Sequence, residues 1–242
     1  MNAHTLTVAL ALTASPFAAF GDTVDLQSKS FHGSGGGAPT IGLDFTGIEG
    51  GSNVGRVTAG GRTYRAGHME YQITTGSRAG TRFHTFCIEI SQTVANGEAM
   101  FQLVDLSQSP DPGPTYSNIV SDRISAVVAN ARVLGWIDGR LQADASQDNY
   151  LGRMGAIQAA IWDAMGATVN IDSADTSDFV RDAYNELLNP GTFDDTRRLS
   201  GLMALTNDSR QDMLYVVPLP PASMAGLGML ALGLGARVIR RR

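Results

Sequence analysis

The spacing of hydrophobic residues changes near the middle of the chain, and this change predicts the fold class. Between about residues 41 and 106, apolar and polar residues alternate in short segments separated by glycines. Such alternation predicts β-strands with one buried face, and Gly-Gly pairs at 50–51 and 60–61 fit hairpin turns. We expect strands in five segments, 41–45, 57–64, 69–75, 83–90 and 100–106.

Beyond a proline-rich break at 109–114, the hydrophobic period becomes helical. We expect helices over about 124–137, 150–165 and 178–188, a fourth helix at 196–205, and a strand at 213–217. The expected fold class is therefore α+β. An N-terminal antiparallel β-sheet or sandwich is followed by a helical part and a final strand, and a C-terminal hydrophobic helix follows these.

The N-terminus has the pattern of an export signal. Residues 1–21 contain no charged side chain, and an apolar run at 6–14 is followed by small residues near position 21. This pattern predicts a secretory signal peptide at 1–21. We expect a Gly-rich leader at 22–40, either flexible or an early strand and loop, and the folded α+β domain at 41–217.

The C-terminal segment 218–242 has three parts. A proline motif begins it, formed by Val217, Pro218, Leu219, Pro220, Pro221 and Ala222. An uncharged stretch of 15 residues follows at 222–236, shorter than the about 20 that span a bilayer without tilt. Four arginines close the chain, Arg237, Arg240, Arg241 and Arg242. Since arginines favour the cytoplasmic side, we expect a marginal membrane helix with the body outside and the tail inside.

This order of proline motif, apolar helix and terminal arginines resembles the PEP-CTERM class of bacterial sorting signals, in its VPLPA-type variant. The motif here carries one extra proline. The resemblance implies export in a Gram-negative bacterium, anchoring in the inner membrane by the C-terminal helix, and processing by an exosortase-like membrane peptidase. The destination would then be the cell surface or the extracellular matrix.

Composition and charge exclude several functions. The net charge is −5, and without the four terminal arginines 14 basic residues face 23 acidic ones, so the body carries about −9. An acidic body argues against a nucleic-acid partner. One cysteine and four scattered histidines exclude a disulfide framework and a cysteine-rich metal site, so we expect no metal and no cofactor.

The single cysteine is the first candidate for chemistry. In the segment Thr-Phe-Cys-Ile-Glu-Ile, strand alternation places Cys87 and Glu89 on one face and Phe86 on the other. An unpaired thiol in an exported protein is exposed to oxidation unless it is buried or has a partner other than sulfur. On the second expected helix, Gln158 and Trp162 lie one turn apart in Ile-Gln-Ala-Ala-Ile-Trp.

Phe-Cys-Ile-Glu on a strand, with Ile-Gln-Ala-Ala-Ile-Trp on a later helix, resembles the thioester domains of bacterial surface adhesins. In that family a Cys sulfur attacks a Gln carbonyl and ammonia leaves. The resemblance implies a Cys87–Gln158 thioester shielded by Phe86 and Trp162. The chain would be no enzyme, but would capture one surface-protein amine or polysaccharide, for adhesion or matrix attachment. Glu89 is either a proton-transfer group or an exposed strand carboxylate.

Other readings stay open. If Cys87 is only a buried hydrophobic residue, the chain is a non-covalent structural protein of the exopolysaccharide or biofilm matrix. A cysteine hydrolase would need a nearby histidine, but His84 falls on the opposite strand face and His68 in no motif. Three loop carboxylates have the ligand type of calcium sites, Asp172, Asp175 and Asp178. They lack the EF-hand spacing, so we expect a solvated helix entry.

Overall fold

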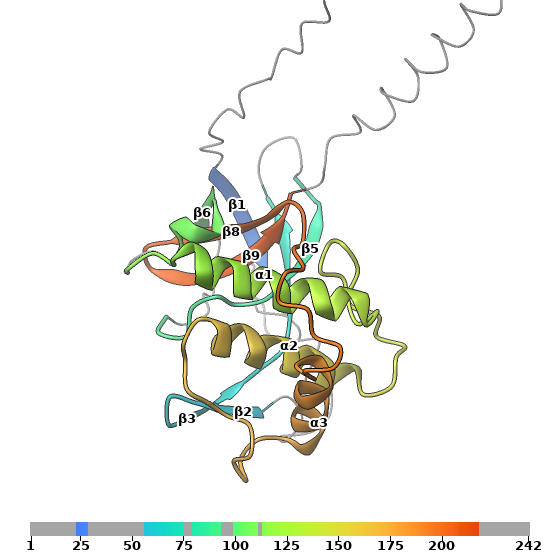
Figure 1. The fold of residues 1–242 in the computed structure, drawn as a ribbon. Coiled ribbons are helices and arrows are strands. Elements are labelled where there is room, and N and C mark those ends of the chain that lie inside the picture. The colour runs from blue at the N-terminus through green and yellow to red at the C-terminus, as the bar shows by residue number, and fades with distance from the viewer. Residues whose placement is uncertain (1–22, 29–55, 75–78, 93–98, 111–112, 218–242) are drawn as a thin grey trace, which may run out of the picture.

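Antiparallel strands and three α-helices form the body of the protein, so the expected α+β class is confirmed (Figure 1). This computed structural model describes residues 23–28, 56–74, 79–92, 99–110 and 113–217. The expected signal peptide, the strand at 41–45 and the tail at 218–242 lie outside these residues. Within the described ranges, no helix has both the length and the apolar character needed to cross a bilayer.

Two antiparallel sheets are present. The larger has the strand order β5-β4-β1-β6-β8-β9. Its strands are β1 (Thr23–Ser28), β4 (Met69–Ile73), β5 (Arg82–Thr85), β6 (Ala99–Val104), β8 (Leu202–Asn207) and β9 (Arg210–Val216). The smaller has the order β3-β2-β7, with β2 (Arg56–Ala59), β3 (Arg62–Arg65) and β7 (Val169–Asn170). Strand β1 lies in the range expected to form a Gly-rich leader, and it pairs with both β4 and β6.

The segment that follows β5 pairs with β9, so it links the two ends of the strand order in the larger sheet. Residues 86–88 run antiparallel to residues 212–214 of β9, with Cys87 opposite Met213. On each side of this pair a backbone N–H donates across to a carbonyl at 2.9 Å. Strand β9 therefore pairs with β8 on one edge and with the cysteine segment on the other, so these described residues leave no open edge at that point.

Helix α2 (Tyr150–Ala164) is the central helix of the fold. Residues 154–162 carry no charge and are all buried, as expected for a helix enclosed on every side. Helix α1 (Asn118–Val133) and helix α3 (Asp178–Leu187) both pack against α2, which also contacts β2. A short 3₁₀ helix, η2, spans Leu106–Gln108 before α1.

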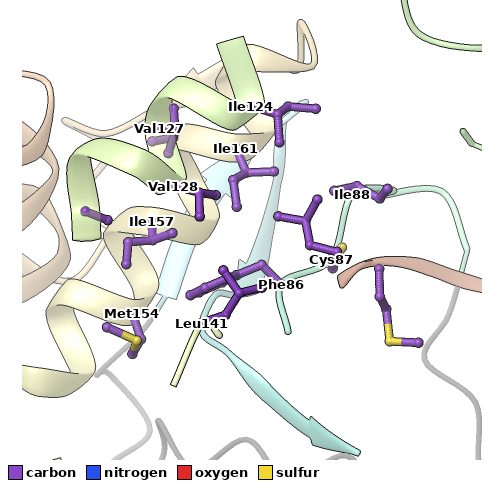
Figure 2. Close-up of a cluster of buried hydrophobic side chains, with 14 of the residues drawn as sticks. Phe86, Cys87, Ile88, Ile124, Val127, Val128, Leu141, Met154, Ile157 and Ile161 are labelled. Carbon is purple, nitrogen blue, oxygen red and sulfur yellow. The ribbon is translucent and has the colours of Figure 1, made fainter. Parts of the chain in front are cut away.

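The cysteine segment lies against the helices in one continuous hydrophobic core. Figure 2 shows Phe86 and Ile88 on one side of a cluster whose other side is formed by Ile157 and Ile161 of α2 and by Val128 of α1. Because the segment packs on both β9 and the helices, its position is fixed from two directions.

Most expected elements are confirmed, and three are corrected. The three helices appear near their expected positions. The segment 57–64, expected as one strand, is the hairpin β2–β3, which turns at Gly60 and Gly61 with φ angles of +55° and +75°. The fourth helix at 196–205 is wrong, because 202–207 forms β8, which pairs with β6 and β9. The strand expected at 83–90 ends at Thr85, followed by the single bridge at Cys87.

A substitution at Gly152 tests how closely α2 packs against α3. A Cβ there would lie 2.3 Å from Asn149 Oδ1 and 2.4 Å from the backbone oxygen of Phe179. We expect Gly152→Ala to lower the free energy of unfolding by about 2 kcal/mol, because backbone must move to admit the methyl group. Urea unfolding of the full chain in detergent measures this change.

Gly139→Ala is the matched control. Its new Cβ would have the Arg132 side chain at 3.5 Å as nearest neighbour, which is ordinary contact. The expected change is within about 0.5 kcal/mol. Equal effects of the two substitutions would contradict the close packing of α2 on α3.

Candidate functional site

The Gln158 carboxamide lies on the peptide unit of Cys87, so the structure brings the two expected site residues together. The Cys87 backbone N–H donates to Gln158 Oε1 at 2.9 Å, and Gln158 Nε2 donates to the Cys87 carbonyl at 2.7 Å. Cys87 is 4% exposed and Gln158 is 2% exposed. Because one bond needs the amide oxygen and the other its nitrogen, the pair fixes the orientation of the carboxamide.

Two polar groups orient the thiol. Trp162 Nε1 donates to Cys87 Sγ at 3.5 Å, and Sγ donates to the backbone oxygen of Glu89 at 2.7 Å. Trp162 and Phe86, the two residues expected to shield the site, are both buried. Trp162 contacts the sulfur directly, whereas Phe86 lies in the hydrophobic core beside it (Figure 2).

Burial raises the pKa of the Cys87 thiol to about 12. The Trp162 hydrogen bond and the bond to the Glu89 backbone lower this pKa, whereas the nearby charges of Glu89 and Asp212 raise it. The thiol is therefore neutral at neutral pH. Since the thiolate is the reactive form, Cys87 needs a base or a strongly polarised acceptor before it can act as a nucleophile.

Glu89 is a buried carboxyl, which corrects the alternative of an exposed strand carboxylate. It is 4% exposed, and burial raises its pKa, against the opposing effect of hydrogen bonds from the Ser91 hydroxyl and the Asp212 backbone. Its Oε1 accepts the Ser91 hydroxyl, and Oε2 has no hydrogen-bond partner among the described residues. Glu89 thus retains a proton to higher pH than an ordinary glutamate.

Two further polar side chains lie at the site, and no motif in the sequence identified them. Asp212 is fully buried at the bridge to the cysteine segment, and Tyr116 donates its hydroxyl proton to the backbone oxygen of Ile88. The sequence feature that could have identified Asp212 is its place directly before the apolar segment 213–217, which is expected to form a strand. Tyr116 stands between the proline-rich break and α1, where no local pattern marks it.

A pocket of about 330 Å³ opens beside the cysteine and the glutamine. Its lining includes Cys87 and Gln158 themselves, together with Arg62, Tyr64, Arg65 and Trp162. The hairpin β2–β3 supplies Arg62, Tyr64 and Arg65, and the Tyr64 ring packs on Trp162 with the centroids 5.6 Å apart. The pocket gives a small molecule or chain end a route to the carboxamide.

Neither of the two described histidines, His68 and His84, is a hydrogen-bond partner of the Cys87 thiol. The hydrogen-bond partners of Sγ among the described residues are Glu89 and Trp162, not a histidine. His68 stacks on His84 with ring centroids 4.8 Å apart, and its Nε2 lies 3.2 Å from the Tyr150 hydroxyl. Burial, with a smaller contribution from His84, lowers the pKa of His68 to about 3, so its ring is neutral.

Two of the three carboxylates considered as calcium ligands form ion pairs with an arginine of α3. Arg181 forms ion pairs with Asp178 and, at 3.9 Å, with Asp172. In the part of the chain that the structure describes, no three His, Cys, Asp or Glu side chains gather in a way that could hold a metal ion.

The raised pKa of Cys87 predicts its reactivity. In Gln158→Met, which cannot form a thioester, we expect iodoacetamide to alkylate the folded chain slowly. The rate should rise about tenfold per pH unit between about pH 7 and 10 without levelling off, because the thiolate fraction keeps increasing towards the raised pKa. Intact mass after timed labelling measures this rate.

The same variant unfolded in urea is the control. Its rate should level off near the ordinary cysteine pKa of about 8.5. A plateau at the same pH in the folded chain would contradict a desolvated thiol.

No protein-family model matches this chain, and neither a curated protein nor a solved structure does. Inferences about function therefore rest on the geometry of the Cys87–Gln158 site and its pocket.

Proposed function

We propose that this protein is exported, anchored at the cell envelope, and captures a partner covalently through an internal thioester between Cys87 and Gln158. The observation that carries the proposal is the buried carboxamide held on the Cys87 peptide unit by two hydrogen bonds. The thiol belongs to the same residue, so nucleophile and acyl donor are already neighbours in one water-poor site.

The existing hydrogen bonds favour the bond-forming step. Cys87 Sγ attacks the Gln158 side-chain carbonyl carbon, and the carbon–nitrogen bond then breaks. The thiol proton goes to the departing nitrogen, so thiol and amide become thioester and ammonia. The Cys87 N–H, 2.9 Å from Oε1, is placed to stabilise the negative charge that develops on this oxygen.

Glu89 is the group we propose for proton transfer in this step. Its buried carboxyl has a raised pKa, so the protonated and ionised forms are both accessible nearer neutral pH. It lies two residues from the thiol, whose own pKa responds to the Glu89 charge. A carboxyl there can accept the thiol proton and deliver it to the departing ammonia.

Burial also supports a long-lived thioester. Trp162, Phe86 and the core limit the access of water. A thiol with a raised pKa is a poor leaving group, which slows hydrolysis. A partner nucleophile that reaches the carbonyl carbon expels the Cys87 thiolate and becomes bonded to Gln158. The reaction is used once, so the protein is a capture device and not an enzyme.

The residue patterns at the two ends of the chain are the basis of the location that we propose. We propose that residues 1–21 direct export and that the C-terminal helix holds the chain in the inner membrane of a Gram-negative bacterium. An exosortase-like enzyme then acts near the proline motif, and the body reaches the surface or matrix for adhesion. The acidic body fits a surface role and not nucleic-acid binding.

Intact mass tests the thioester directly. We expect the full chain to be lighter than its sequence mass by one ammonia. Cys87→Ala and Gln158→Ala should each have full mass, because each removes one of the two bonded groups. Gln92→Ala is the matched control, since it removes another glutamine that lines the pocket and should keep the deficit.

Full mass in the unaltered chain, with a thiol that labels after unfolding, would contradict the proposal. That outcome favours a non-covalent matrix protein with Cys87 as a core residue.

Glu89→Gln tests the proton-transfer role. The amide keeps the size of the side chain but cannot act as an acid or a base near neutral pH. We expect ammonia release to slow about a hundredfold, as is typical when a general acid–base group is lost. The fraction of chains with the ammonia deficit is followed by mass from the earliest time after synthesis.

Glu70→Gln removes a carboxyl that pairs with Arg82 away from the pocket, so it should leave the rate unchanged. Equal rates for Glu89→Gln and the unaltered chain would exclude the role of Glu89.

A further inference from the structure

The pocket beside the thioester site is basic, although the body is acidic. Arg62 and Arg65 line it, and none of the described residues lining it is Asp or Glu. Neither guanidinium forms an ion pair with a carboxylate of the described residues. Although the body carries a charge of about −9, the two arginines at the pocket opening can attract an anion locally.

The rest of the lining fits a sugar ring. Tyr64 and Trp162 supply aromatic groups, and Gln92 and Gln211 supply planar amides, which donate and accept hydrogen bonds. Apolar ring faces with a few polar side chains are the usual lining of a small-molecule site. An arginine adds a fork of donors that binds a carboxylate at two points.

We propose that the pocket binds a carboxylated polysaccharide, of the uronic-acid type, and presents one of its hydroxyl groups to the thioester. The inference rests on the proposed function and names the partner class for the same site. The carboxylate would lie on Arg62 and Arg65, and the sugar ring against Tyr64 and Trp162. A lysine partner is disfavoured, because its ammonium group would approach two guanidinium groups.

The capture step balances without another reactant. The sugar hydroxyl oxygen attacks the thioester carbon, the carbon–sulfur bond breaks, and the hydroxyl proton passes to the Cys87 sulfur. The products are an ester between the Gln158 acyl group and the sugar, and a free thiol. The mass therefore rises by one whole sugar oligomer, and no small molecule leaves in this step.

Oligogalacturonate is the probe, and its methyl ester, in which the carboxylates are neutral and every ring hydroxyl remains, is the matched ligand. With the full chain in detergent, we expect the oligogalacturonate adduct to form at least about tenfold faster at low salt. The double substitution Arg62→Gln and Arg65→Gln should remove this preference while retaining the ammonia deficit. Arg140→Gln changes an exposed arginine outside the pocket lining and should preserve the preference.

Three outcomes overturn the inference while the thioester itself stands. Equal rates for the acid and its methyl ester, faster labelling by Nα-acetyl-lysine, or faster labelling by an acidic serine-containing peptide would each exclude an acidic glycan as the partner. A chain with no ammonia deficit contradicts the proposed function instead.

Binding without chemistry gives an independent test. Cys87→Ser cannot form the thioester, yet we expect it to bind oligogalacturonate in calorimetry, and to lose this binding when Arg62 and Arg65 are also replaced by Gln. Absence of binding in Cys87→Ser would contradict the glycan site whether or not the thioester forms.

Discussion

The hydrogen-bond pair between the Gln158 carboxamide and the Cys87 peptide unit is the constraint on which the site depends. In an antiparallel ladder, a residue that does not exchange bonds with its opposite neighbour points its N–H and C=O to the other side. Cys87 is such a residue opposite Met213, since Phe86 and Ile88 make the bonds to β9. The Gln158 amide takes the place of a neighbouring strand and satisfies two buried backbone groups.

Burial of this site protects the Cys87 thiol, and it also sets the conditions under which the thiol can react. Desolvation raises the pKa of the Cys87 thiol and of the Glu89 carboxyl. The thiol is thereby kept from oxidants, and it requires a local proton acceptor and a polarised carbonyl to react. We propose that two groups meet these requirements, the Glu89 carboxyl, whose charge affects the pKa of the thiol, and the Cys87 N–H on Gln158 Oε1. The adjoining pocket then decides which molecules reach the Cys87–Gln158 site.

Local sequence patterns predicted most of the strands and helices, but not how they associate. The helical spacing of apolar residues over 150–165 predicted α2, and Gly60 with Gly61 predicted the β2–β3 turn. The apolar residues at 202–205 suit either period, so the pattern predicts a helix over 196–205, and only pairing with β6 and β9 makes 202–207 the strand β8. The joining of 86–88 to β9 involves residues more than 120 positions apart, which no local pattern reports.

The sequence by itself determined the residue types of the site, the helix that carries Gln158 and Trp162, the acidic charge of the body and the pattern of its two ends. Only the tertiary structure decided that Gln158 lies on the Cys87 peptide, that Glu89 is buried, and that Arg62 and Arg65 line the adjoining pocket. The physical reason is that periodicity and propensity act over a few residues. Desolvation, by contrast, and the hydrogen bonding of a buried peptide unit are set by whichever distant segments pack there.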